Sequence, residues 1–121
     1  MTTSDLIPPP PSEGSKEVAA RVARARDPQA ERYAALGLDG VHTNDQASGP
    51  TLEQVVRADG AGMSLLRDAA DVMRLSARGY HRVLRVARSL ADLDGADNVG
   101  RVHLAEALSY RALADEVRRA A

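Results

Sequence analysis

Four arginines recur every three or four residues between positions 78 and 88, with one histidine among them. At 100° per residue, Arg78, Arg82, Arg85, Arg88 and His81 fall on one side of a helix. Guanidinium groups donate paired hydrogen bonds that match phosphate and carboxylate oxygens. The pattern therefore indicates a surface for an anion. The alternative is a solvated polar face, although such a face usually mixes charges of both signs.

Arg78 has the most unusual position in this set. We expect it in the first turn of its helix, with Ser76 as the N-cap. Free backbone N–H groups and the helix dipole make that end positive, so a cation there is disfavoured by about 0.3–1 kcal/mol. A helix N-terminus joined by an arginine can, however, receive an anion, above all a phosphate. This end of the stripe is therefore the candidate binding point.

One long helix must position these side chains. It begins after Ser76 and runs through the sequence up to the turn "GADNVG". Apolar residues recur at helical spacing on the side away from the arginines and predict its buried face. These residues are Val83, Val86, Ala87, Leu90 and Leu93.

The rest of the chain also predicts helices. The apolar residues are mainly Ala, Leu and Val, with three Tyr and no Phe or Trp, and no segment alternates as a strand would. We therefore predict an all-α fold, a small helical bundle. Its parts are a disordered proline-rich segment over 1–14, a helix with a polar loop over 15–50, and a bundle over 51–121.

Single residues predict where the helices begin and end. Pro28 should kink or split the first helix, with Asp27 capping its second piece, and Gly37 should end it. Thr51 should cap a short helix that Asp59 and Gly60 end. In the last helix, four residues are predicted to face inward: Val102, Ala105, Leu108 and Leu113.

Composition excludes several classes of function. The net charge of −1 gives no broad affinity for nucleic acid, and the absence of Cys excludes thiolate metal sites and thiol catalysis. His103 and Glu106 have metal-ligand spacing but no partners, so we expect no metal site. No long apolar run predicts a membrane span, and we expect a cytoplasmic protein. The pattern G-x-x-x-x-G-K-[ST] is missing, so the chain alone should neither bind ATP tightly nor hydrolyse it.

The stretch "LSARGYHRVLRVARSLADLDGADNVGRVHLAEALSYR", residues 75–111, resembles the C-terminal segment of the magnesium-chelatase-like AAA+ ATPases of the ComM/YifB competence family. In that family a helix opening LSAR-x-Y-x-R precedes HLAEAL-x-YR. Ser89 and Leu90 stand where Thr and Ile are usual. Upstream, Arg26, Gln29 and Arg32 match an AR-x-x-Q-x-x-R helix that leads to a "TN" loop at 43–44. The resemblance covers about residues 5–114.

The resemblance implies a role for Arg78. Lid helices of AAA+ proteins often open with Ser-x-Arg, whose arginine, the second sensor, contacts the terminal phosphate of ATP held by the ATPase core. Ser76 and Arg82 would support it, whereas Arg85, Arg88 and His81 would contact DNA or a neighbouring subunit. The chain would then be a lid without catalytic residues of its own, and residues 1–14 a linker from the core.

The parent protein implied by the resemblance is a hexameric ATPase that uses ATP and Mg2+ and drives DNA branch migration in natural transformation. The partners of the lid would be the core domain of its own polypeptide and neighbouring subunits of a homohexamer, with DNA possible and no membrane. Two alternatives stay open. One is the lid of a true metal-chelatase motor subunit, and the other is a stand-alone helical module that binds DNA or a protein through its arginine face.

Overall fold

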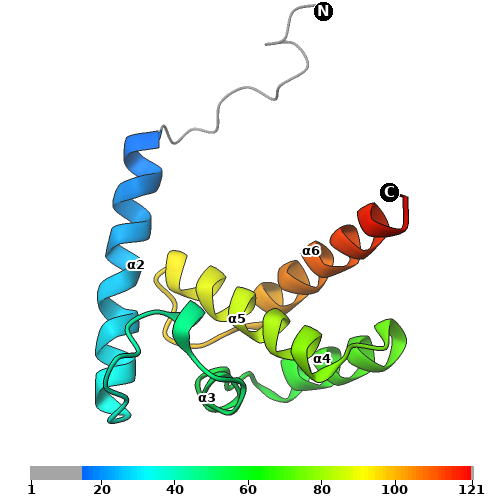
Figure 1. Ribbon diagram of the computed structural model, residues 1–121, viewed down its shortest axis with the longest axis horizontal. Helices are drawn as coiled ribbons and strands as arrows, with labels where there is room; N and C mark the ends of the chain where they lie inside the picture. The colour runs from blue at the N-terminus through cyan, green and yellow to red at the C-terminus, as the bar shows by residue number, and fades with distance from the viewer. Residues whose placement is uncertain (1–14, 121) are drawn as a thin grey trace, which may run out of the picture.

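The computed structural model describes residues 15–120, which form five α-helices and one 3-10 turn and contain no strand (Figure 1). The all-α prediction is confirmed. The predicted disorder of residues 1–14 lies outside the described residues. The elements are α2 (Ser15–Ala35), η1 (Asn44–Gln46), α3 (Gly49–Val55), α4 (Gly60–Met73), α5 (Ala77–Leu93) and α6 (Arg101–Ala120).

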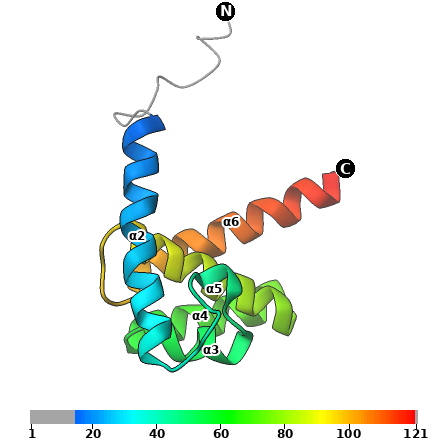
Figure 2. The same cartoon turned by 60° about the vertical axis from the view of Figure 1, so that its left-hand side comes forward.

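Helix α5 is the centre of the bundle. It packs against α2, η1, α3 and α6, while α4 packs against α6. Figure 1 and Figure 2 both show that the first half of α2 and the second half of α6 extend beyond the other helices. Among residues 15–120, none of the helices has the length and apolar character needed to cross a membrane.

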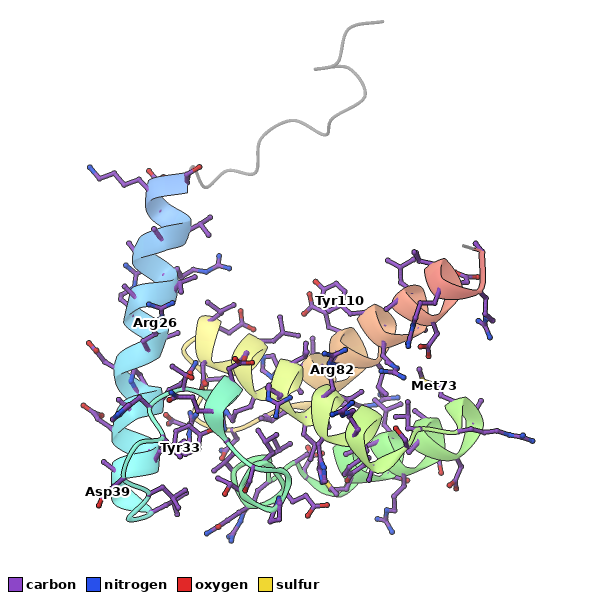
Figure 3. The ribbon with its side chains drawn as sticks, viewed as in Figure 1. Arg26, Tyr33, Asp39, Met73, Arg82 and Tyr110 are labelled. Carbon is purple, nitrogen blue, oxygen red and sulfur yellow. The ribbon has the colours of Figure 1, made fainter. Side chains whose placement is uncertain are left out.

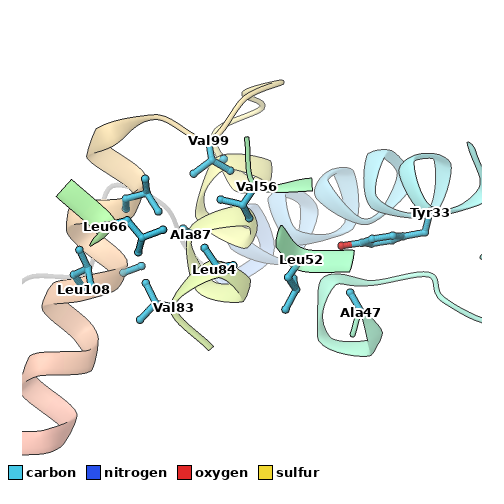
Figure 4. Packing of buried hydrophobic residues seen from close by; sticks show 13 residues of the cluster. Tyr33, Ala47, Leu52, Val56, Leu66, Val83, Leu84, Ala87, Val99 and Leu108 are labelled. Atoms are coloured by element: carbon cyan, nitrogen blue, oxygen red, sulfur yellow. The ribbon is translucent and has the colours of Figure 1, made fainter. Parts of the chain in front are cut away.

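The hydrophobic core gathers around the buried side of α5 (Figure 4). Leu52 of α3, Leu66 of α4 and Leu104 of α6 are fully buried there, and Tyr33 brings α2 into the same cluster. Val99, in the loop before α6, is also buried in this cluster. Because every helix contributes at least one of these side chains, the core fixes the position of α5 from all sides.

Side-chain caps define the helix starts. Ser76 Oγ accepts the Gly79 N–H at 3.1 Å, which confirms Ser76 as the N-cap of α5. Asp59, predicted only as a breaker, caps α4 through the Gly62 N–H. The prediction of Thr51 as a cap is wrong, since Ser48 caps α3 and Thr51 lies in its first turn. Ser48 precedes Gly49-Pro50, and proline suits the first turn of a helix.

Helix α2 runs through Pro28 without interruption, so the predicted split and the cap at Asp27 are wrong. Pro28 is exposed. The carbonyl left without its N–H partner can therefore bond to water, and the residues on either side are good helix formers. The predicted stop is confirmed, because Gly37 has a φ of 73° and donates its N–H to Ala34 O while Leu38 bonds to Tyr33 O.

The buried faces of α5 and α6 differ from the predicted ones. On α5, Val83 and Ala87 are buried as predicted, but the buried side also includes Arg88 and Asp92. On α6, Leu108 is buried while Val102, Ala105 and Leu113 are exposed. Leu104 and Ala107 point inward instead. Only the first half of α6 packs on the bundle, so the second half keeps apolar side chains in solvent.

Candidate functional site

The first two turns of α5 present two cations and free backbone donors to solvent. Arg78 and Arg82 are both exposed, and neither forms an ion pair within residues 15–120. Ser76 takes the N–H of Gly79, and the N–H groups of the exposed Ala77 and Arg78 precede the first bond of the helix. The structure thus leaves Arg78 free to contact an anion that comes from outside the described residues.

Arg111 of α6 lies next to the same turn. A Cβ placed on Gly79 would be 3.5 Å from Cζ of Arg111, so this guanidinium lies over the start of α5. Arg111 also lines one groove together with Arg82. Its Nε donates to Asp115, one turn further along α6. Three arginines from two helices therefore surround the start of α5 and make this end of the bundle basic.

The other two arginines of the predicted face hold the fold together. Arg88 is only 2% exposed, so its predicted place on an exposed face is wrong. It donates to the backbone oxygens of Val55, Ala96 and Asp97 at 3.0–3.3 Å. Arg85 is half-buried and donates to the oxygens of Asn44 and Ala47.

These bonds satisfy carbonyl groups where helices and turns end. The four arginines therefore do not share one surface, and the guanidinium of Arg88 is out of reach of DNA or a second subunit.

His81 lies against another helix instead of facing solvent. A Cβ on Gly49 would be 2.4 Å from Cε1 of the His81 ring, so the ring fills the space where a side chain at 49 would stand. Its Nε2 is 3.5 Å from a carboxylate oxygen of Glu53 in α3. The position of His81 thus joins α5 to the start of α3, which was not predicted.

A buried polar network surrounds Asp92. Arg32 donates to both carboxylate oxygens at 2.6 and 3.1 Å, Arg88 donates at 3.0 Å, and the side-chain amide of Asn44 donates at 2.9 Å. Asn44 in turn accepts the Tyr33 hydroxyl proton and donates its backbone N–H to Gln29. One carboxylate therefore ties α2, η1 and α5 together.

The pKa values of the two arginines that contact Asp92 are shifted in opposite directions. Burial by itself would lower the pKa of Arg32, but the hydrogen bond and charge of Asp92 outweigh it, so that pKa is raised. For Arg88, burial has the largest effect and lowers the pKa. The positive charge of Arg32 lowers it as well, while the negative charge of Asp92 raises it. An arginine stays protonated in both settings. The network is thus one buried cation, Arg88, and one partly exposed cation, Arg32, on one buried anion.

His103 and Glu106, which have metal-ligand spacing in the sequence, bond to different partners in the structure. His103 receives the Gly100 N–H on Nδ1 and bonds Asp94 through Nε2, which fixes the start of α6. Glu106 instead accepts the hydroxyl proton of Tyr110. Residues 15–120 contain no group of three His, Cys, Asp or Glu side chains placed to hold a metal ion.

Sequence reasoning missed Asn44 and Arg111 as partners of the arginine helix, and it also missed the pair that Arg88 forms with Asp92 one turn along α5 itself. A contact between α5 and a residue of another helix leaves no trace in helical spacing. The matched motif did contain a signal, because Gln29, Arg32 and Asn44 belong to the quoted "AR-x-x-Q-x-x-R" and "TN" patterns. Their joint contact with α5 gives those motifs a structural reason.

The chain is similar in sequence to a known protein family and to several known proteins. Residues 12–111 match the family described as the C-terminal part of the magnesium chelatase subunit ChlI. An uncharacterised protein of Mycobacterium tuberculosis is 44% identical over 99 residues, which cover 82% of this chain and 19% of the relative. Competence protein ComM of Haemophilus influenzae is 34% identical over 84% of the chain and 18% of its own length. YifB of Escherichia coli is 34% identical over 88% and 21%. The chain thus spans about a fifth of these relatives' length.

Proposed function

Because the chain belongs to the family of C-terminal domains of the magnesium chelatase subunit ChlI, we propose that it works as the lid of a magnesium-chelatase-like AAA+ ATPase. In this function Arg78 senses nucleotide. It contacts the terminal phosphate of ATP bound by the core domain, and Ser76 and Arg82 support it. The chain itself hydrolyses no ATP.

The free cation at the start of α5 is the observation that carries this proposal. Arg78 is exposed, has no ion pair within residues 15–120 and lies where the helix dipole disfavours it. A bound phosphate makes the position of Arg78 favourable, because the guanidinium and the N–H groups of the first turn all donate hydrogen bonds to the same anion. The charge on a transferring phosphoryl group is stabilised by such donors.

The similarity to these relatives also supports a proposal for the function of the parent protein. We propose that it forms a homohexamer, uses ATP and Mg2+, and acts on DNA by branch migration, as the likeness to competence protein ComM suggests. The alternative is a metal-chelatase motor that acts on a tetrapyrrole, which the family description favours. A cytoplasmic place is part of the same proposal.

The stand-alone DNA-binding module is less well supported. That reading needs four arginines on one face to neutralise phosphates. Arg88 is buried and Arg85 donates to two carbonyl oxygens, so only Arg78 and Arg82 of the stripe stay free. Two charges in a chain of net charge −1 give little affinity for DNA.

The test compares the full-length parent with a version that lacks residues 15–120. We expect the deletion to lower ATP turnover at least about tenfold, and the intact protein to move a synthetic four-way DNA junction only with ATP. Unchanged turnover after the deletion would contradict the lid function. ATP-dependent insertion of Mg2+ into protoporphyrin, with no junction movement, would select the chelatase alternative.

A further inference from the structure

A groove of about 580 Å³ runs between α5 and the second half of α6, where Arg82 and Tyr110 are labelled in Figure 3. Apolar side chains form most of it. Val83 and Val86 come from α5, and the rest come from α6: Ala107, Tyr110, Leu113, Ala114 and Val117.

The α6 side of this groove has the spacing of a helix-packing face. Tyr110, Leu113, Ala114 and Val117 follow the intervals i, i+3, i+4 and i+7, which place them on one side of a helix. All four are exposed, and the three large ones are exposed by 51% for Tyr110, 58% for Leu113 and 62% for Val117. This part of α6 extends beyond the bundle in both views (Figure 1 and Figure 2). An apolar helix face left in solvent marks a site for another protein segment.

The charged side chains that line the groove are all arginines, namely Arg82, Arg111 and Arg118. Asp115 pairs with Arg111 and Arg118, so these two arginines share one acidic neighbour and the rim stays positive. Arg82 forms no ion pair within residues 15–120. The rim therefore favours a partner that brings carboxylates.

We propose that this groove binds an amphipathic helix of another domain or protein, whose apolar face is flanked by acidic side chains. The apolar face packs along Tyr110, Leu113 and Val117, and the carboxylates meet the arginine rim. A second copy of this chain docked through the same groove would bring its own arginines against this rim, since a symmetric interface pairs a surface with itself. The inference goes beyond the lid function, because it does not depend on what Arg78 contacts.

The probe is a synthetic amphipathic helix of about 18 residues, long enough to fold on binding. One version has leucines on one face and glutamates beside them, and a matched version has lysines in place of the glutamates. Each is titrated into the 121-residue chain and followed by backbone amide NMR shifts. We expect the glutamate peptide to shift the groove residues of α5 and α6 and to bind at least about fivefold more tightly than the lysine peptide.

Matched variants separate the groove from the rest of the surface. Leu113→Ser should weaken binding about tenfold, whereas Val72→Ser, which changes a side chain 83% exposed on α4, should have no effect. Arg118→Glu should weaken binding about fivefold, whereas Arg119→Glu, next to it but outside the groove, should change it less than about twofold. All four positions are exposed, so the fold is kept.

Several results would overturn the inference. The two peptides could bind with equal affinity, or the amide shifts could lie outside the groove. The chain could also form a dimer that Leu113→Ser dissociates. Absence of any shift with the glutamate peptide at millimolar concentration would overturn it as well.

Discussion

Arg78 and Arg88 show how one residue type serves two purposes on the same helix. Arg88 faces α3 and the loop before α6, where carbonyl oxygens surround its guanidinium together with Asp92 of its own helix. Arg78 faces solvent at the first turn and has no ion pair among residues 15–120. A buried arginine is accounted for by the bonds that it makes inside the protein. An exposed arginine at the positive end of a helix needs an anion from outside.

At the same scale, Asp92 should carry much of the stability of the fold. Asp92→Asn keeps the shape of the side chain but leaves Arg32 and Arg88 without their shared anion. Removing one partner of a buried ion pair costs about 3–5 kcal/mol, because an uncompensated charge stays buried. We expect a loss of that size in the free energy of unfolding, measured by urea titration of the chain.

Asp94→Asn is the matched control. Asp94 lies two residues further along and is exposed, and its side chain bonds only His103 within residues 15–120. An exposed pair contributes about 0–1 kcal/mol, so this variant should lose no more than that. Equal losses for the two variants would mean that the buried network adds nothing.

The tyrosines give a pH test of the packing. Burial raises the pKa of Tyr33, although Arg32 opposes it, and burial also raises that of Tyr80. For Tyr110 the hydrogen bond and charge of Glu106 raise the pKa. The folded chain thus holds these phenol protons more tightly than the unfolded chain, so their contribution to stability is complete below a pH of about 10 and is lost above it.

Tyrosinate absorbance should therefore rise at a higher pH in the native chain than in the same chain in concentrated urea. Coincident curves would show that burial and Glu106 leave the phenols unaffected.

At the scale of elements, α2 contains a proline that it does not need for its fold. Pro28 lies inside a continuous helix and is exposed. Proline is about 3 kcal/mol less favourable than alanine in a helix interior, and part of that cost is already relieved by water at the free carbonyl. Pro28→Ala should raise the free energy of unfolding by about 1–3 kcal/mol. Slower amide exchange in the first half of α2 would report the same gain, and a destabilised variant would contradict it.

Most of the helices could be predicted from the sequence, because caps, glycines and apolar spacing act locally. Ser76 and Gly37 define ends of α5 and α2 as predicted. The errors arose where tertiary packing decides. Pro28 does not end α2, since the residues after it are held by α5 and η1. The inward face of α6 was mistaken because only half of that helix has a partner to pack against.

The candidate site was predictable only in part. The spacing of arginines on α5 was evident, and the position of Arg78 at an N-terminus follows from the cap at Ser76. Which arginines point inward depends on Asp92 and on carbonyl groups of other elements. Asp92 lies one turn further along α5 itself, whereas the carbonyl groups come from the end of α3 and from the loop before α6, whose places in space no local pattern encodes. A rule of 100° per residue therefore assigned Arg88 to the wrong side.

At the scale of the whole molecule, the domain presents two adjoining surfaces, which share Arg82 and Arg111. The start of α5 offers a free arginine, and the second half of α6 offers an apolar groove with a basic rim. The chain spans about a fifth of the length of its relatives, so both surfaces are open to the remainder of such a protein. We infer that the buried network around Asp92 keeps α2 and α5 in a fixed relation while these surfaces engage their partners.

The central claim is that Arg78 contacts phosphate, and Arg101 provides a matched comparison. Both are exposed arginines in the first turn of a helix, so replacing either by alanine should stabilise the chain by about 0.3–1 kcal/mol. Stability therefore cannot distinguish them. The decisive measurement is ATP turnover of the full-length parent. We expect Arg78→Ala to lower it at least about tenfold and Arg101→Ala to leave it within about twofold. Equal effects of the two substitutions, or no effect of Arg78→Ala, would contradict the claim.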